Sequence, residues 1–382
     1  MKAIGLMSGT SLDGIDAACV RIEPDGARYD LELLRFSTVA FDPELARALR
    51  AALPPNRGSV EALASLHRLL GIALARAARA VAAGEGIDYV ASHGHTMWHD
   101  GDRCVTLQAG DPFAIREAIK ASVCYDFRSA DCAAGGHGAP LIPYVDALLF
   151  GGAGEDRVAL NLGGIANVTL LSKDPSAAIR AFDTGPGNML IDALVRARTN
   201  AAFDERGSFA AAGRADAKLL SAMLEHEYFE RPAPKSTGRE AFGSHFFDPH
   251  ATRLDELSLE DAAATVTELT AASVAGALER EGFASARIFV SGGGAHNATL
   301  LARLAERLPQ ARVETSQAVG VPVDAKEAMG FALLGYETLR GRPSNVPSAT
   351  GASTAVALGA IAPYELPSLL RKVERECAAA SS

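Results

Sequence analysis

Cysteine is scarce in this sequence, and no two cysteines have the spacing of a redox or zinc motif. The five are Cys19, Cys104, Cys124, Cys132 and Cys377, an odd number without a C-x-x-C pair. Disulfide frameworks need paired cysteines and zinc knuckles need closely spaced ones, so neither is expected. A reducing, cytoplasmic environment fits this cysteine usage.

Long hydrophobic runs are also absent. The alanine-rich stretch at residues 63–83 is interrupted by His67, Arg68, Arg76 and Arg79. A membrane-spanning helix needs about 18 uncharged apolar residues, so this stretch predicts an amphipathic helix instead. The chain starts with one positive charge, Lys2, and passes directly into an apolar strand without the h-region of a signal peptide. We therefore expect neither export nor a membrane partner.

Positive charge is in deficit, with 37 Lys and Arg against 46 Asp and Glu and a formal net charge of -9. Nucleic acids and anionic lipids bind clustered Lys and Arg, so the composition argues against both as partners. Hydrophobic residues make up 48% and charged residues 22%, as in an ordinary soluble globular protein. A chain of 382 residues exceeds what one hydrophobic core organises, which predicts two domains.

The two halves of the chain show the same order of predicted elements. In the first half, β-like runs at residues 2–7, 15–22 and 31–39 precede helical sequence at 44–53 and 60–83 and a strand at 89–92 that ends in a polar loop. In the second half, short β-like runs at 157–162, 168–171 and 179–182 precede a helix at 257–281, a strand at 287–291 and a helix at 324–340. This duplicated βββαβα order predicts an α/β, two-lobed, actin-like ATPase and sugar kinase fold with an ATP cleft between the lobes.

Two segments are candidate connections between the lobes. One is rich in Gly and Ala, at residues 126–143, and the other carries prolines, at residues 342–347. We therefore expect an N-terminal lobe of residues 1–130 plus about 350–382, and a C-terminal lobe of residues 131–349.

Three glycine turns are candidate nucleotide contacts. The first, residues 8–14, combines Gly9 and Gly14 with hydroxyls and Asp13, which could hold Mg²⁺ directly or through water. The second, residues 161–167, follows the first strand of the second half, and the third, residues 291–297, follows a buried-looking strand and opens a helix at Ala298. Glycines let backbone N–H groups approach phosphate or a flat ring closely, whereas the alternative in each place is an ordinary turn.

Asp183 is the candidate catalytic base. It follows a hydrophobic strand and precedes a glycine-proline turn that leads into a helix near Met189. A carboxylate emerging from a strand into a cleft can accept a proton from a sugar hydroxyl or from water, and phosphoryl transfer needs little else beyond positioning and Mg²⁺. The alternative is that Asp183 only caps the following helix.

Other polar residues are candidates for substrate contacts. The run from His93 to His99 contains three histidines but no acidic or cysteine partner at metal-ligand spacing, so sugar-contacting or structural roles are favoured over a metal site. Trp98 offers an apolar face to a sugar. Arg128 could anchor an anionic group through its planar guanidinium, with a salt bridge between the lobes as the alternative. Glu327 could bind substrate hydroxyls, although a helical Glu is by default a solvated residue.

The segment from Gly5 to Asp16, GLMSGTSLDGID, resembles the opening signature of the anhydro-N-acetylmuramic acid kinase family. The resemblance extends over nearly the whole chain. It continues through SHG at 92–94, LQAGDP at 107–112, DFR at 126–128, GAPL at 138–141, residues 161–167, FDTGPGN at 182–188, KSTGRE at 235–240 and KEAM at 326–329.

This resemblance implies an actin-like kinase that uses ATP and Mg²⁺, acts as a homodimer and serves peptidoglycan recycling. In the implied reaction, water opens the 1,6-anhydro bridge of anhydro-N-acetylmuramic acid and O6 takes the γ-phosphate, giving N-acetylmuramic acid 6-phosphate and ADP. Asp183 matches the base that activates the water, Glu327 matches a substrate-contacting acid, and Asp13 is the candidate Mg²⁺ ligand.

The expected nucleotide contacts are Gly9, Thr10, Ser11, Leu12, Asp13, Gly14, Ile15, Asp16, Asn161, Gly163, Gly164, Gly292, Gly293, Gly294 and Asn297. The expected substrate contacts are His93, His95, Thr96, Arg128, Gly185, Gly187, Asn188 and Glu327.

The sequence departs from the family pattern at three positions: His95 and His137 stand where glutamine is expected, and Gly243 where asparagine is expected. Histidine keeps hydrogen-bonding capacity, so we expect retained activity with altered affinity or a pH-dependent binding step. The alternatives are another hexosamine or carboxylate kinase of the same fold and a non-catalytic, ATP-binding actin-like scaffold.

Overall fold

The computed structural model describes residues 1–9, 12, 14–25, 28–53, 58–84, 86–152 and 154–379. The chain divides into two compact units. Unit 1 consists of Met1–Leu149 together with Ala325–Ser382, and unit 2 of Phe150–Asp324. Unit 2 is therefore inserted into unit 1 in sequence. Within the described residues, no helix combines the length and apolar character needed to cross a bilayer.

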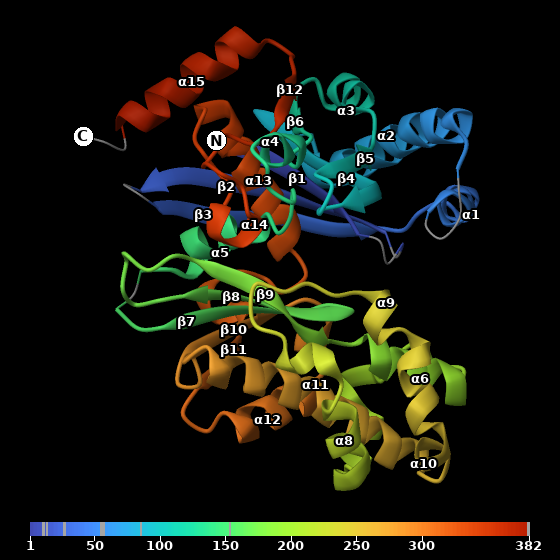
Figure 1. Ribbon diagram of the computed structural model, residues 1–382. Coiled ribbons are helices and arrows are strands. Elements are labelled where there is room, and N and C mark those ends of the chain that lie inside the picture. Colours follow the sequence, from blue (N-terminus) through green and yellow to red (C-terminus); the bar gives the residue numbers. More distant parts are fainter. Residues whose placement is uncertain are drawn as a thin grey trace. The chain divides into compact units, whose positions relative to one another are not determined.

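Unit 1 is built on one mixed sheet. Its elements are β1 (Lys2–Ser8), β2 (Ile15–Asp25), β3 (Arg28–Val39), α1 (Pro43–Ala52), α2 (Val60–Ala82), β4 (Tyr89–Asp100), β5 (Val105–Ala109), α3 (Pro112–Ile119), β6 (Ser122–Tyr125), α4 (Ser129–Ala133), α5 (Ile142–Phe150), α13 (Lys326–Arg340), α14 (Pro347–Thr350), β12 (Ala360–Ala362) and α15 (Leu366–Ala379). The strand order is β12-β6-β4-β1-β2-β3, with β5 paired to β4 (Figure 1).

Alternation along the strands separates the two faces of this sheet. On β1, Ala3 belongs to the hydrophobic cluster that includes α13, whereas Ile4 and Leu6 belong to the cluster that includes α2. Successive side chains of a strand point to opposite faces, so this pattern places α13 and α2 on opposite sides of the sheet. Both faces are therefore buried.

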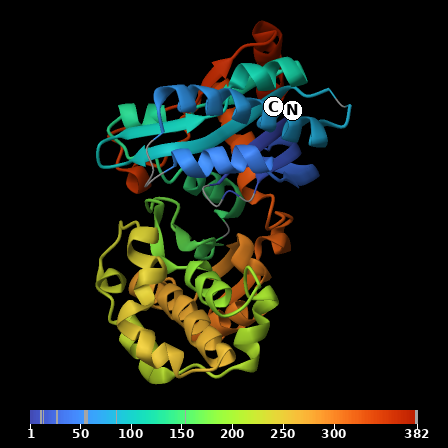
Figure 2. The same cartoon turned by 90° about the vertical axis from the view of Figure 1, so that its right-hand side faces the viewer.

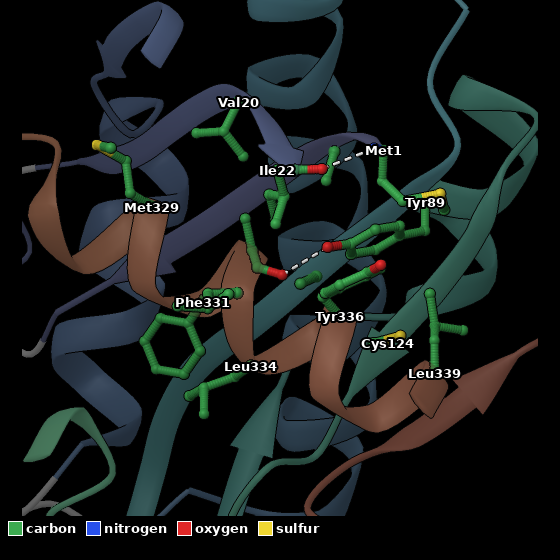
Figure 3. Packing of buried hydrophobic residues seen from close by; sticks show 14 of the residues in the cluster. Met1, Val20, Ile22, Tyr89, Cys124, Met329, Phe331, Leu334, Tyr336 and Leu339 are labelled. Atoms are coloured by element: carbon green, nitrogen blue, oxygen red, sulfur yellow. Dashed lines mark hydrogen bonds between the residues drawn. The ribbon is translucent and has the colours of Figure 1, made fainter. Parts of the chain in front are cut away.

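Helix α13 packs very closely against the sheet (Figure 3). A Cβ on Gly5 would lie 1.8 Å from the carbonyl oxygen of Ala328, so only glycine allows this approach. The Tyr89 hydroxyl donates to the carbonyl oxygen of Ala332 over 2.8 Å, and Phe331, Leu334 and Tyr336 fill the surrounding core. This packing fixes the position of the first turn of α13, which carries Glu327.

Unit 2 contains the second sheet and most of the remaining helices. Its elements are β7 (Arg157–Leu162), β8 (Ile165–Leu171), β9 (Arg180–Pro186), α6 (Met189–Arg198), η1 (Glu205–Gly207), α7 (Ser208–Ala212), α8 (Ala217–Leu224), η2 (Glu227–Glu230), α9 (Arg239–Phe242), η3 (Ser244–His250), α10 (Ala251–Asp255), α11 (Leu259–Arg280), β10 (Arg287–Ser291), η4 (Gly293–His296), α12 (Ala298–Arg307), β11 (Arg312–Thr315) and η5 (Ser316–Val319). The long helix α11 runs through this unit (Figure 2). Its C-terminal half and α12 contribute to the cluster that covers one face of the sheet.

The two sheets share one strand order. The order is β11-β10-β7-β8-β9 in unit 2 and β6-β4-β1-β2-β3 in the corresponding part of unit 1, with the same parallel and antiparallel pairs. The predicted duplication and the actin-like α/β fold are thus confirmed.

The boundaries between the units differ from those that we expected near residues 131 and 349. The units meet in sequence at Leu149/Phe150 and Asp324/Ala325, so the Gly/Ala-rich segment at 126–143 lies inside unit 1. The helix expected at 324–340 also belongs to unit 1, because its apolar side chains pack on the unit 1 sheet. Pattern alone could not assign this helix, since it follows unit 2 directly in sequence.

The first strand after α2 is also longer than predicted. We expected residues 89–92 followed by a polar loop, but β4 runs to Asp100 because its second half pairs with β5. The histidine-containing segment is therefore an ordered hairpin strand.

Candidate active site

Asp183 is held at three points within unit 2. It lies on β9 opposite Asn167, and its carboxylate oxygen Oδ2 accepts the Thr237 N–H over 2.9 Å. Its own N–H donates to the carbonyl oxygen of Lys235 over 3.0 Å, and its carbonyl oxygen accepts the Tyr228 hydroxyl over 2.8 Å. Asn188 occupies the N-cap position of the helix that follows, and no side chain makes a capping bond there, so Asp183 does not have the capping role that was the alternative.

The environment of Asp183 suits a proton acceptor. Burial raises the pKa of its carboxyl to about 6, the Thr237 N–H opposes this rise, and the Glu240 carboxylate adds to it. A carboxylate with a pKa close to the working pH can remove a proton and later release it. This is the behaviour required of a general base near neutral pH.

Lys235 fixes the segment that supplies Thr237. Its ammonium donates to the carbonyl oxygens of Tyr228 and Phe229, over 2.9 and 3.3 Å, and lies 4.6 Å from the centre of the Tyr228 ring. Because Tyr228 also bonds to the Asp183 carbonyl, one connected set of contacts orients both the carboxylate and its donor.

Two glycine turns of unit 2 meet at the end of its sheet. The N–H groups of Gly187 and Asn188 donate to the carbonyl oxygens of Gly164 and Gly163, over 2.9 and 2.8 Å. The Asn188 side-chain amide also donates to the Leu162 carbonyl oxygen over 3.1 Å. These bonds join the turn after β7 to the turn after β9.

The third turn approaches the same place. A Cβ on Gly294 would lie 2.5 Å from that of Leu162, and one on Gly292, where φ is +78°, would lie 2.5 Å from Asn161 Oδ1. Gly293 has no atom closer than 3.8 Å to its Cβ position. Side-chain-free backbone of this kind fits a bound nucleotide.

Two of the expected contacts have packing or capping roles in unit 2. Asn297 accepts the Leu300 N–H through its side-chain oxygen over 2.9 Å and so caps α12. Gly185, with φ of 150°, leaves no room for a Cβ, which would lie 2.7 Å from the Phe229 ring.

His93 and Arg128 form a rigid pair in unit 1. Nε2 of His93 accepts from Nε and Nη2 of Arg128 over 3.1 and 2.9 Å, and Nδ1 contacts the Gly94 carbonyl oxygen at 3.1 Å. This pattern requires the neutral Nδ1–H tautomer, and burial, reinforced by Arg128, keeps the pKa of His93 well below its usual value. Both ring nitrogens of His93 are therefore engaged, and the third nitrogen of the guanidinium, Nη1 of Arg128, donates to the carbonyl oxygen of Gly138 over 2.7 Å.

His95 supports the first glycine turn. Its Nδ1 lies 2.9 Å from Ser8 Oγ, which also contacts the carbonyl oxygen of Gly14, and the ring is fully buried. Burial lowers the pKa of His95 to about 4, so it is neutral near pH 7. Its Nε2 has no partner among the described residues.

Part of the first glycine turn falls outside the described residues, namely Thr10, Ser11 and Asp13. Around them, the Leu12 N–H donates to the Gly9 carbonyl oxygen over 3.3 Å, and Ile15 is buried. Asp16 Oδ1 accepts the Thr38 hydroxyl over 2.6 Å. Thr96, a candidate substrate contact, accepts the side-chain amide of Gln108 over 3.2 Å. The described residues contain no cluster of three or more His, Cys, Asp or Glu side chains suited to a metal.

Glu327 lies on the first turn of α13, beside a buried ion pair. Burial raises the pKa of Glu327, and the Lys326 ammonium opposes the rise more strongly than any other charge. Lys326 Nζ is 2.8 Å from Asp146 Oδ1 on α5, and both side chains are at most 5% exposed. Asp16 raises the pKa of Glu327 further and Arg128 lowers it, which shows that candidates from several elements share one region of unit 1.

Our sequence analysis did not single out Thr237 or Asp146. The signal for Asp146 was present, because it is the lone charge in the apolar helix IPYVDALLF, and a charge there requires a partner. Thr237 gave no such signal, since its relation to Asp183 depends on a contact across 54 residues.

Two of the departures from the family pattern, Gly243 and His137, have close neighbours in the structure. A Cβ at Gly243 would lie 2.6 Å from the Arg239 carbonyl oxygen, so the expected asparagine would need a local shift. The His137 side chain packs against Gly101, and the backbone N–H of His137 donates to the Thr350 carbonyl oxygen over 2.8 Å.

Comparison with known proteins gives one consistent result. The family model described as anhydro-N-acetylmuramic acid kinase matches residues 1–364. Curated relatives with that name include one from Xanthomonas axonopodis pv. citri, 45% identical and covering 94% of this chain and 97% of that protein. Another, from Streptomyces coelicolor, is 43% identical and covers 96% and 95%.

Solved structures align more loosely. The activator of the 2-hydroxyisocaproyl-CoA dehydratase from Clostridium difficile with bound ADPNP covers 87% of this chain and 93% of that chain, at 14% identity and a TM-score of 0.41. At that likeness, the fold assignment depends on the strand order of the two sheets and not on the alignment.

Proposed function

We propose that this chain, which belongs to the anhydro-N-acetylmuramic acid kinase family, phosphorylates anhydro-N-acetylmuramic acid with ATP in cell-wall recycling. The products are N-acetylmuramic acid 6-phosphate and ADP. The main support for the proposed reaction is Asp183. Its carboxylate is largely buried, accepts the Thr237 N–H, and has a pKa raised to about 6.

The reaction joins a hydrolysis to a phosphoryl transfer. Asp183 removes a proton from water while the water oxygen bonds to the anomeric carbon and the bond from that carbon to O6 breaks. O6 keeps the electron pair and bonds to the γ-phosphorus as ADP leaves. Water thus supplies the new anomeric hydroxyl, and its second proton is held by Asp183 until it passes to solvent.

The backbone of unit 2 is suited to hold the nucleotide. The turns at Gly163–Gly164 and Gly292–Gly294 offer backbone without side chains, which suits close contact with a nucleotide. The loop from Gly9 to Asp16 is the phosphate-binding loop that the family resemblance implies. Mg²⁺ would be held by Asp13, directly or through water, because carboxylate oxygens are its preferred protein ligands. When bound, it neutralises charge on the transferring phosphate.

In unit 1, Arg128 and Glu327 are the residues proposed to contact the sugar. The Arg128 guanidinium suits a carboxylate such as the lactyl group of muramic acid. The Glu327 carboxylate is suited to accept a hydrogen bond from a hydroxyl of the sugar. The homodimer and the cytoplasmic location are also proposals, and light scattering on purified protein tests the first.

The deciding experiment measures ADP release with Mg-ATP and anhydro-N-acetylmuramic acid, with N-acetylmuramic acid and N-acetylglucosamine as controls. Turnover with the anhydro sugar alone, and incorporation of one oxygen from ¹⁸O-labelled water into the anomeric hydroxyl at quench, supports the coupled reaction. Turnover only with a control sugar would contradict it.

A further inference from the structure

The hydroxyl of Thr237 is buried beside Asp183 without a hydrogen-bond partner among the described residues. The N–H of the same residue donates to Asp183 Oδ2 over 2.9 Å, so the hydroxyl belongs to the residue that contacts the carboxylate. Buried polar groups in native proteins are almost always paired. An unpaired hydroxyl next to a candidate base therefore indicates that a molecule from outside the chain completes its bonding.

The polar groups around Thr237 have hydrogen-bond partners, whereas the Thr237 hydroxyl has none among the described residues. The Lys235 ammonium, the Tyr228 hydroxyl and the Asp183 N–H all have partners within unit 2. Oδ2 of Asp183 accepts the Thr237 N–H, which leaves Oδ1 as the carboxylate oxygen without a hydrogen bond among the described residues. Two oxygen atoms, one of the Asp183 carboxylate and one of the Thr237 hydroxyl, are thus left without a hydrogen bond among the described residues.

We propose that the Thr237 hydroxyl holds the attacking water together with Asp183. One O–H of the water donates to Asp183 Oδ1 and the other to Thr237 Oγ1, which leaves a lone pair of the water for the anomeric carbon. In the reaction, the water proton passes to Asp183, the new bond from oxygen to carbon forms and the bond to O6 breaks, while Thr237 keeps its own proton. This inference rests on the proposed function, because it names a further residue for the same hydrolytic step.

The test uses two substitutions at position 237 in the full-length protein. Thr237→Val removes the hydroxyl with little change of shape and keeps the N–H that bonds to Asp183, and Thr237→Ser keeps both groups. We expect kcat to fall about 10- to 100-fold in Thr237→Val, the effect of one lost hydrogen bond in the transition state, and Thr237→Ser to restore most of it. The KM for the anhydro sugar should change little, because water is not part of that sugar.

Stability separates this role from a structural one. Thr237→Val removes a polar atom that lacks a partner in the ligand-free chain, so its melting temperature should equal or exceed that of the wild type. The kcat is thus expected to fall while the melting temperature stays the same or rises. If Thr237 only supported the fold, its replacement would lower both kcat and the melting temperature.

Thr267 provides a matched control. Its hydroxyl is also buried without a partner among the described residues, but Thr267 lies on α11 and has no side-chain hydrogen bond to Asp183. Thr267→Val should keep the wild-type kcat and an equal or higher melting temperature. This variant measures what removal of a buried, unpaired threonine hydroxyl does elsewhere in unit 2.

Three outcomes would overturn the inference: a wild-type kcat in Thr237→Val, a loss of kcat matched by a loss of stability, or a raised KM with unchanged kcat, which would place the hydroxyl on the sugar. A wild-type enzyme without turnover of the anhydro sugar would remove the proposed function and this inference together. Wild-type turnover with an unaffected Thr237→Val variant would remove the inference alone.

Discussion

A carboxyl whose pKa is raised by burial serves catalysis at a cost in stability. The pKa of about 6 in Asp183 exceeds the ordinary aspartate value of 3.8, so the folded state binds the proton more tightly than the unfolded state does. The stability contributed by this proton is present at low pH and is lost as pH rises through the window from about 4 to 6. At neutral pH the ionised group therefore destabilises the fold and is available as a base.

Asp183→Asn should separate these two effects. We expect kcat to fall about 10²- to 10⁴-fold, the usual contribution of a general base. At pH 7.5 the variant should be more stable than the wild type, by about 1–3 kcal/mol, and this difference should vanish near pH 4. Coupled ADP release and thermal melts at the two pH values measure both. Equal stability differences at both pH values would contradict the assigned ionisation.

The same pKa predicts the pH dependence of the wild type. The kcat/KM should decline below about pH 6 as Asp183 becomes protonated. His93 and His95 should not contribute to this decline, because burial keeps both neutral. An added inflection that disappears in His95→Gln, which restores the family's residue, would show instead that His95 titrates.

At the scale of elements, the ion pair between α5 and α13 positions and tunes Glu327. Lys326 lowers the pKa of Glu327 and Asp146 raises it, with Asp16 and Arg128 as the other charged neighbours. Lys326→Met should therefore raise the pKa of Glu327, and Asp146→Asn should lower it. The pH dependence of anhydro-sugar binding, measured by calorimetry, reports these shifts. Shifts in one common direction would indicate structural distortion instead.

Both substitutions should also destabilise unit 1. Each leaves a charge buried without its main partner, which typically costs about 3–5 kcal/mol, so binding must be measured well below the melting temperature. Reduced stability in both variants, together with opposite pKa shifts, is the combination expected of this pair.

The third glycine turn predicts different results for adjacent residues. Gly294→Ala would place a Cβ 2.5 Å from that of Leu162, so this variant should lose stability. Gly293→Ala meets nothing closer than 3.8 Å and should fold like the wild type. If the turn holds the nucleotide, Gly293→Ala should still raise the KM for ATP, because its methyl group occupies space that the ligand needs. An unchanged KM for ATP would remove this turn from the nucleotide site.

Local patterns predicted most of the elements but not their partners. The meander strands and α11, with Ser258 accepting the Asp261 N–H at its start, follow from periodicity and capping. The contacts of Thr237 with Asp183 and of Lys326 with Asp146 join residues 54 and 180 positions apart. Such contacts are set by the packing of the whole chain, which no local pattern contains.

At the scale of the whole molecule, the clearest example is α13. Its sequence reads as the last helix of the second half, yet its residues Met329, Phe331 and Leu334 belong to the core of unit 1. The helix is apolar on several sides because it is buried in that core. The hydrophobic pattern of the sequence indicates that the helix is buried, but it does not indicate which of the two sheets the helix packs against.

The unit boundaries can be tested with two fragments. Residues 150–324 contain a complete five-stranded sheet and two hydrophobic clusters of their own, so this fragment should be soluble and unfold cooperatively. Residues 131–349, the lobe expected from sequence, would add α13 without the sheet that covers it, and this fragment should aggregate. Circular dichroism melts and light scattering compare the two. If the longer fragment were the more stable, α13 would pack with unit 2, and the position of Glu327 would have to be assigned anew.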